Sequence, residues 1–184
     1  GIIVFIMMLV FLLAKRAGEL LCDNAESQVY KRMAYLDYMT RMNNRTAFEQ
    51  RMDQLDRERE EELTLVMIDL NGLKRVNDRR GHREGDEMIR RTAKAIQKVF
   101  GAAGACYRIG GDEFAVILEG SGYDQMQLRN RLREELRESG KRLDYLLSVS
   151  VGFACAEPKQ ELSAWELLKC ADREMYEEKR QWYH

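Results

Sequence analysis

Two acidic sites next to glycine are the residues most suited to chemistry in this sequence. Asp69 ends a long apolar run, and Asp112 and Glu113 directly follow two glycines. A carboxylate at the end of a buried strand loses solvation unless a cation or hydrogen-bond donors lie nearby. If the two sites lie side by side, their like charges would repel, and a magnesium ion shared with phosphate oxygens would relieve that repulsion. The pattern therefore favours a divalent metal that holds a nucleotide triphosphate.

Each acidic residue alone also has an ordinary structural interpretation. Asp69 is a suitable cap for a following helix, and Asp112 and Glu113 are common turn residues. A calcium-binding EF-hand loop starting at Asp69 is excluded, because its sixth and twelfth positions are Lys74 and Arg80, where Gly and Glu are needed. The chemical interpretation rests on the combination of the two sites.

A short turn after the first acidic site is suited to binding phosphate. Gly72 and Leu73 can offer free backbone N–H groups there. Lys74 then adds a positive point charge for the same phosphates. Taken alone, Lys74 is an ordinary solvated lysine.

Three polar residues further along are suited to reading a base. The carboxylate of Asp86 can accept hydrogen bonds from the N1–H and N2–H groups of guanine, which adenine lacks, and Asn77 can pair with another edge. His82 would line the same pocket. Asp86 could also serve only as a favourable charge near a helix N-terminus, and His82 only as a structural histidine.

The spacing of apolar residues predicts how these groups are positioned. The expected order is a helix over 43–59, a strand over 63–68, a helix over 84–100, strands over 106–109 and 114–118, a helix through 128–136 closing near 140, a strand over 146–154 and a helix from 163 to about 179. Gly110-Gly111 indicates a hairpin, since both glycines can take positive φ. A capping box formed by Ser163 and Glu166, with Leu162 and Leu167 as its staple, predicts where the last helix begins.

The β-α-β-β-α-β run inside this order predicts an α+β, ferredoxin-like palm. We expect a nucleotidyl cyclase-like mixed sheet with helices on one face. Polymerase palms and nucleotidyl cyclases use such a sheet, but a fold alone does not set a function. If the central strand neighbours the hairpin, Asp69 and Asp112 converge at one end of the sheet.

Composition excludes several classes of protein. Hydrophobic residues make up 45% of the 184 residues, charged residues make up 33%, and the net charge is -1. No broad basic surface for nucleic acid is therefore expected. The four cysteines are widely scattered without a C-x-x-C pair, which argues against zinc and for reduced thiols in a cytosolic setting.

The N-terminal residues form a separate region. Residues 1–14 carry no charge, and Lys15 and Arg16 follow at once. We expect residues 1–14 to be the C-terminal part of a transmembrane helix that begins before this sequence, with the basic pair on the cytoplasmic side. A buried terminal helix is an alternative, whereas a signal peptide fits poorly because no small-residue cleavage site precedes the charges. Residues 15–35 are expected to form a connecting signalling helix, either a weak coiled coil or a solvated helix.

Several separated stretches resemble the GGDEF family of bacterial diguanylate cyclases. The signature Gly-Gly-Asp-Glu-Phe is intact. The matching stretches are residues 37–45 for the opening motif, 69–86 for the D-x-D-x-x-K-x-x-N-D-x-x-G-H-x-x-G-D motif, 110–114 for the signature, and 148–152 and 171–179 for the closing strand and helix. The resemblance covers residues 36–184, which are expected to form a GGDEF domain.

The resemblance implies an activity and its partners. Such enzymes condense two GTP molecules into cyclic di-GMP and release two pyrophosphates, with magnesium (or manganese) as cofactor. Each subunit binds one GTP, so a homodimer is implied. The N-terminal helix would attach the protein to the bacterial inner membrane, with the GGDEF domain on the cytoplasmic side and no role for nucleic acid.

The same resemblance implies roles for individual residues. Asp69, the Leu70 carbonyl and Asp112 would hold the metal, and Glu113 would join them. Asp112 would also take the proton of the 3′-hydroxyl group, and Lys74 would stabilise the charge of the transition state. The residues implied to bind GTP are Gly72, Leu73 and Lys179 for the triphosphate, and Asn77, His82 and Asp86 for guanosine.

Four positions depart from the family pattern. Asn71 stands where the family has a second Asp, and Arg41 stands where its opening motif has Gly. Residues 101–104 lack the R-x-x-D of product-inhibited members, so that inhibitory site is expected to be absent. Residues 182–184 replace the family's G-R-N, which removes one basic triphosphate contact. The departures at Asn71 and Tyr183 leave a second hypothesis open, a catalytically weak GGDEF module that binds GTP and signals by contact. Asp86 disfavours a mixed guanine–adenine product.

Overall fold

The computed structural model describes residues 1, 7–8, 15–16, 34–141, 143–158, 160 and 162–183. The chain divides into two compact units, residues 1–35 and 36–184. The predicted membrane helix over residues 1–14 and connecting helix over 15–35 lie almost entirely outside the described residues, and both stay predictions. Among the residues that are described, no helix combines the length and the apolar character needed to cross a membrane.

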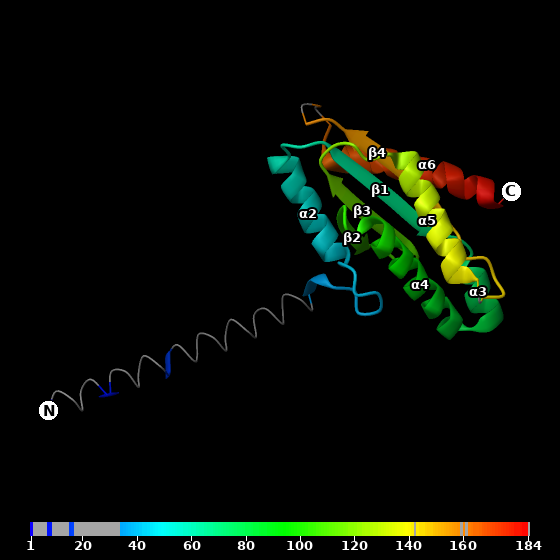
Figure 1. Cartoon of the computed structure of the whole chain (residues 1–184), viewed down its shortest axis with the longest axis horizontal. Helices are drawn as coiled ribbons and strands as arrows, with labels where there is room; N and C mark the ends of the chain where they lie inside the picture. Colours follow the sequence, from blue (N-terminus) through cyan, green and yellow to red (C-terminus); the bar gives the residue numbers. More distant parts are fainter. Residues whose placement is uncertain are drawn as a thin grey trace. The chain divides into compact units, whose positions relative to one another are not determined.

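The second unit is built on a four-stranded sheet (Figure 1). Its strands are β1 (Leu63–Leu70), β2 (Gly104–Arg108), β3 (Glu113–Glu119) and β4 (Val149–Ala156), in the spatial order β2-β3-β1-β4. The α+β, ferredoxin-like prediction is confirmed, but the predicted mixed sheet is wrong, because the pairings between these four strands are all antiparallel. The hairpin reverses β3 relative to β2, and β3 then lies between β2 and β1, so no two parallel strands become neighbours.

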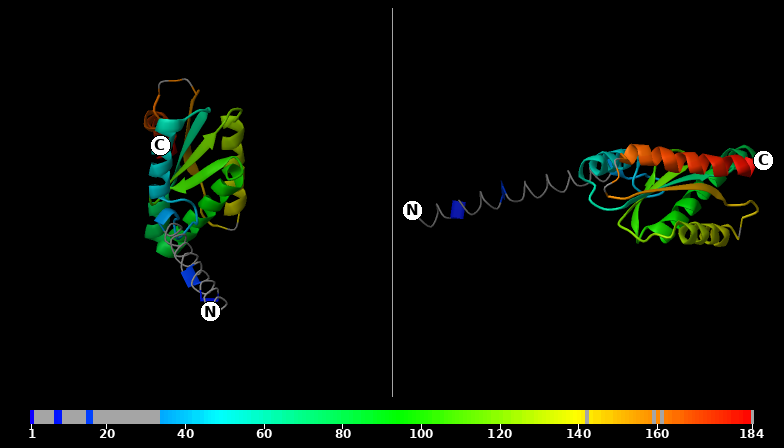
Figure 2. Two further views of the ribbon diagram at one scale, coloured as in Figure 1. Left: turned by 90° about the vertical axis from the view of Figure 1, so that its left-hand side faces the viewer. Right: turned by 90° about the horizontal axis from the view of Figure 1, so that it is seen from above.

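Helices cover both faces of this sheet (Figure 2). The helices are α2 (Arg45–Glu58), α3 (Leu73–Arg80), α4 (His82–Phe100), α5 (Gln125–Gly140) and α6 (Ala164–Tyr183). The predicted single helical face is therefore wrong. Alternate residues of β1 explain why: Val66 and Ile68 pack in the cluster with α4 and α5, whereas Leu65 and Met67 pack in the cluster with α2 and α6. Both faces of β1 are apolar, so both need a covering layer.

Local sequence signals set where α2 and α6 begin. The Asn44 side chain caps α2 by accepting a hydrogen bond from a backbone N–H of its first turn. At α6, the Ser163 amide donates to the Glu166 carboxylate and the Glu166 amide donates to the Ser163 hydroxyl, both at 3.0 Å. Leu162 and Leu167 pack in one cluster. The predicted capping box is therefore confirmed, and the direct contact of Leu162 with Leu167 stays a prediction.

A charged network fixes α6 to the outer side of β4. The backbone amides of Val151 and Phe153 donate to the carboxylates of Glu178 (3.2 Å) and Glu174 (2.9 Å). Arg129, on α5, donates to both carboxylates and to the Val151 carbonyl at 2.8 Å. Since Lys179 follows Glu178 directly, this network also sets where the Lys179 side chain lies.

Candidate active site

The end of β1 and the hairpin turn are in direct contact. The Leu70 amide donates to the Asp112 carbonyl at 2.9 Å. Asp69 lies opposite Glu113 in the pairing of β1 with β3. Residues directly opposite each other on antiparallel strands share a face, with Cβ atoms about 4.5–5.5 Å apart. β1 therefore does neighbour the hairpin, and its acidic end meets the turn that bears Asp112.

The turn over residues 109–113 has no left-handed backbone angle at its glycines, and the Glu113 side chain lies close to Gly110. The amides of Ile109 and Gly110 both donate to the Glu113 carbonyl, at 3.0 and 3.2 Å. Neither Gly110 nor Gly111 has a positive φ, so that part of the hairpin prediction is wrong. A Cβ at Gly110 would lie 2.4 Å from Oε2 of Glu113. The Glu113 side chain thus folds back over Gly110, into space that a side chain at Gly110 would share.

Asp69 is a buried carboxylate that the protein satisfies only in part. The residue is 2% exposed, and its Oδ2 accepts a hydrogen bond from Nζ of Lys179 at 2.6 Å. Its Oδ1 is buried without any hydrogen-bond partner. Burial raises the pKa of Asp69 above its usual value, Lys179 offsets this only in part, and the nearby Asp112 and Glu113 raise the pKa further. The orphaned oxygen marks a place where a cation would stabilise the charge.

The oxygen ligands at this end of the sheet suit a hard divalent ion. Within the described residues, no three or more His, Cys, Asp or Glu side chains are grouped so as to hold a metal by themselves. Magnesium is commonly held by one or two carboxylates together with phosphate oxygens and water. Asp69, the Leu70 carbonyl, Asp112 and Glu113 are the groups that could supply the protein's share.

Lys179 reaches this site from α6, far away in the sequence. The resemblance implied that it binds the triphosphate, whereas here its ammonium group is paired with Asp69. Its side chain is 26% exposed, so solvent or a phosphate could still reach it. The phosphate contact itself stays a prediction.

The predicted phosphate turn directly follows β1. Gly72 has φ 77°, a left-handed conformation that favours glycine, and it caps α3. The Val76 amide donates to the Gly72 carbonyl at 3.1 Å, which closes the first turn of the helix. Leu73 and Lys74 are therefore the first two residues of α3, and the Lys74 side chain is exposed. The turn places N-terminal helix amides beside the acidic end of β1.

The predicted base-reading residues Asn77 and Asp86 lie on α3 and α4, which pack against each other. The Oδ1 atom of Asn77 is buried without a hydrogen-bond partner. It lies against α4, where a Cβ added to Gly85 would be only 1.9 Å away from it. Asp86 follows Gly85 and is half-buried, whereas His82, the first residue of α4, is exposed. The Asn77 side chain thus lies against the residue that precedes Asp86, and the absence of a side chain at Gly85 leaves room for Asn77 Oδ1.

The Asn71 side chain is buried and bonds to a residue of β4. It is 3% exposed, and its Oδ1 accepts a hydrogen bond from the Ser150 hydroxyl at 2.9 Å. Ser150 lies opposite Asp69 in the pairing of β1 with β4. Sequence reasoning missed Ser150, although a serine in a strand that is otherwise buried and apolar is a signal that it has a partner.

A second ion pair supports the hairpin turn and was also missed. Nη1 of Arg108 lies 3.2 Å from Oδ1 of Asp37, and the two side chains are only 10% and 16% exposed. Arg108 Nη2 also donates to the Gly111 carbonyl at 2.9 Å. Burial alone would raise the pKa of Asp37, but hydrogen bonds from Thr40 and Arg108 outweigh it and lower that pKa. The pair ties residues 37–40 to the turn, and the signal in the sequence was a lone charge at the end of a strand without other charges.

Comparison with known proteins places this geometry in a family. The sequence profile described as "Diguanylate cyclase, GGDEF domain" matches residues 34–183. The signaling protein YkoW of Bacillus subtilis is 35% identical over 161 residues, which cover 83% of this chain and 20% of YkoW. An uncharacterized membrane protein of Staphylococcus saprophyticus is 29% identical over 151 residues, which cover 78% of this chain and 42% of that protein. The chain thus spans less than half the length of these relatives.

A solved structure shows the same fold. The coiled coil and GGDEF domain of DgcB from Caulobacter crescentus, solved in complex with c-di-GMP, superposes with a TM-score of 0.78. It is 28% identical in sequence, and the match covers 92% of this chain and 93% of the DgcB chain.

Proposed function

The chain belongs to the GGDEF family, and from this premise we propose that it is a diguanylate cyclase that condenses two GTP molecules into cyclic di-GMP and releases two pyrophosphates. One observation carries the proposal: the acidic end of β1 meets the glycine turn, with Leu70 bonded to Asp112 and Asp69 opposite Glu113. The orphaned oxygen of Asp69 supports a cation there. The family, by itself, would be compatible with binding alone.

The proposed reaction is an in-line displacement between two nucleotides. The 3′-hydroxyl oxygen of one GTP attacks the α-phosphorus of the other, the bond to pyrophosphate breaks, and Asp112 takes the hydroxyl proton. Bound magnesium (or manganese) would neutralise charge on the triphosphate. Asp69, the Leu70 carbonyl and Glu113 would share in holding that ion. Lys74 would stabilise the charge that develops on the phosphate.

Substrate choice is assigned to the region where α3 packs on α4. The N1–H and N2–H groups of a guanine placed there would donate hydrogen bonds to the Asp86 carboxylate. Asn77, whose Oδ1 is buried without a partner, would meet another edge of the base. The amides of Gly72 and Leu73 would bind the phosphates, and His82 would border the pocket.

The test is incubation with GTP and magnesium followed by chromatographic separation of the products. We expect cyclic di-GMP and pyrophosphate, formed linearly in time. Asp112→Asn should abolish turnover, because it removes the charge, and should leave the fold intact, because the side-chain volume is kept. Asp172→Asn, at an exposed position of α6, is the matched control and should retain activity. Full turnover by Asp112→Asn would refute the assignment.

A GTP-binding module with weak catalysis is the second candidate. It is favoured by one contact, the 2.6 Å pair that places the Lys179 ammonium on Asp69 Oδ2, where it competes with a metal ion. Tight GTP binding without any cyclic product would support this candidate over the first.

For the whole protein we propose a homodimer attached to the bacterial inner membrane by the N-terminal helix, with the GGDEF domain on the cytoplasmic side. The uncharged residues 1–14 and the membrane protein named among the relatives support the attachment. The need for two GTP molecules supports the dimer.

A further inference from the structure

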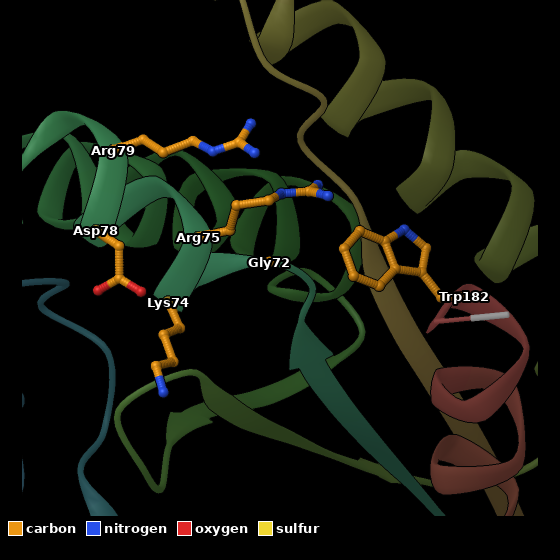
Figure 3. A pocket seen from close by; sticks show the side chains of 6 residues that line it. All are labelled: Gly72, Lys74, Arg75, Asp78, Arg79 and Trp182. Atoms are coloured by element: carbon orange, nitrogen blue, oxygen red, sulfur yellow. The ribbon is translucent and has the colours of Figure 1, made fainter.

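A pocket of ≈ 450 Å³ opens beside the phosphate turn (Figure 3). It is lined by Gly72, Lys74, Arg75, Asp78, Arg79 and Trp182. Three of these side chains are cationic and one is anionic, so the lining is positive on balance. A pocket of this charge next to helix N-terminal amides is suited to a polyanion.

Trp182 of α6 forms one wall of the pocket and lies on the phosphate turn. A Cβ at Gly72 would be 3.1 Å from Cη2 of Trp182 and 3.4 Å from Nη2 of Arg75. The guanidinium carbon of Arg75 lies 5.3 Å from the centroid of the Trp182 ring, within the range of a cation–π contact. The indole therefore holds the Arg75 guanidinium close to the backbone that would bind phosphate.

The remaining side chains divide the pocket into two sides. Figure 3 shows Arg79 extending in the same general direction as Arg75, towards Trp182. The side chains of Lys74 and Asp78 point in a different direction, away from Trp182. The only carboxylate of the lining is therefore turned away from the two arginines.

The two arginines keep their charge available for a ligand. In the part of the chain that the structure describes, neither Arg75 nor Arg79 forms a salt bridge, whereas the adjacent Arg80 is paired with Asp144 at 2.8 Å. A guanidinium fork matches phosphate oxygens and can bind them through two parallel hydrogen bonds.

We propose that Arg75 and Arg79 bind the terminal phosphates of GTP in this pocket, and that Trp182 positions Arg75 for that contact. This inference rests on the proposed function, because it adds residues to the same substrate site. A triphosphate held by the Gly72 and Leu73 amides would extend its terminal phosphates past Gly72 into the pocket. The arginines would then also hold the pyrophosphate that leaves.

The test compares nucleotides that differ only in their phosphates. Titration calorimetry with magnesium and 3′-deoxy-GTP, 3′-deoxy-GDP or 3′-deoxy-GMP avoids turnover, because the attacking hydroxyl is absent. Arg75→Met should weaken binding of 3′-deoxy-GTP about 10- to 100-fold, the loss expected for a charged hydrogen bond. Binding of 3′-deoxy-GMP should stay within about twofold of the wild type. The affinity of Arg75→Lys for 3′-deoxy-GTP should lie between those of the wild type and Arg75→Met, since lysine keeps the charge but lacks the planar fork.

Variants of Trp182 and of a control arginine distinguish the positioning of Arg75 from a direct contact with the nucleotide. Trp182→Leu should weaken the binding of 3′-deoxy-GTP and leave the binding of 3′-deoxy-GMP unchanged. The Arg75→Met/Trp182→Leu double variant should bind 3′-deoxy-GTP no more weakly than Arg75→Met alone. Arg131→Met, which removes an exposed arginine on α5, should bind all three nucleotides as the wild type does. Thermal melts would verify that each variant is folded.

The outcomes distinguish this inference from the proposed function. If the wild type does not bind 3′-deoxy-GTP, the proposed function fails. If the wild type binds it and Arg75→Met leaves the preference for triphosphate over monophosphate unchanged, only the assignment of Arg75 is overturned. An equal loss for all three nucleotides would also overturn it, because it would show a purely structural role.

Discussion

Asp69 holds a charge in a place where the protein alone stabilises it poorly. One oxygen is paired with Lys179, and the other is buried without a partner. The raised pKa of this carboxyl means that the folded state binds its proton more tightly than the unfolded state does. Ionised Asp69 therefore lowers the stability of the fold, a cost that a bound cation would reverse.

We expect Asp69→Asn to abolish cyclase activity and to raise the melting temperature at pH 7. The wild type regains stability as the pH falls through the raised pKa of Asp69, whereas the variant has no such group. The difference in melting temperature should therefore shrink as the pH falls from 7 towards 4. In a domain of this size, about 1 kcal/mol corresponds to roughly 2–4 °C. Calorimetric melts across this pH range, without divalent metal, would measure it, and a lower melting temperature for the variant at pH 7 would contradict the argument.

Arg41 is strained in a way that a single substitution can relieve. Among the described residues it is the only one other than glycine with a positive φ, 61°. Arg41→Gly should stabilise the protein by roughly 0.5–1 kcal/mol, because relief of the left-handed strain exceeds the entropy lost by glycine. Urea unfolding at equal protein concentration would measure the change. Gln50→Gly, at an exposed position inside α2, is the control and should be destabilising.

At the scale of elements, α6 connects the edge of the sheet to the site. It carries Glu174 and Glu178, which bond to β4, and Lys179, which bonds to Asp69. Arg129 of α5 joins the two glutamates. The position of Lys179 therefore depends on a network that touches no substrate.

Arg129→Met should destabilise the protein by about 1–3 kcal/mol, because it leaves two half-buried carboxylates without their main cation. Arg131→Met removes an exposed arginine of the same helix and should change stability by less than about 0.5 kcal/mol. Denaturant titrations of both variants would compare them. Equal stability of the two would show that the network contributes little.

The elements themselves could largely be predicted from the sequence. Phe48, Met52 and Leu55 recur at helical spacing and are all buried in α2. Ser163 and Glu166 are close in sequence, so the start of α6 was also predictable. Such signals are local, because the burial of a helix face depends mostly on its own spacing of apolar residues.

The contacts between distant elements could not be predicted in the same way. Lys179 meets Asp69, and Arg108 meets Asp37, only because the sheet brings these segments together. The second helical layer was missed because a strand that is apolar on both faces does not say what covers each face. The contact of Asp69 with the hairpin could be predicted only under the condition that β1 neighbours β3.

At the scale of the whole molecule, the proposed reaction needs two subunits. Each chain offers one acidic site, and the product contains two nucleotides. We expect the rate per subunit to rise with protein concentration below the dissociation constant of the dimer and to level off above it. Turnover measured across a dilution series, with the mass in solution measured in parallel, would show this. A rate per subunit that stays constant while the protein is monomeric would contradict the need for a dimer.

The carboxylates of α6 also cover the outer edge of β4. β4 is the last strand of the described sheet, and an open strand edge is a template on which another chain can aggregate. Glu174 and Glu178 occupy the outward amides of Phe153 and Val151, so another strand cannot bond to these two amides. Proteolytic loss of α6 would therefore expose a strand edge on which other chains can aggregate. Solubility and the position of Lys179 thus depend on the same helix.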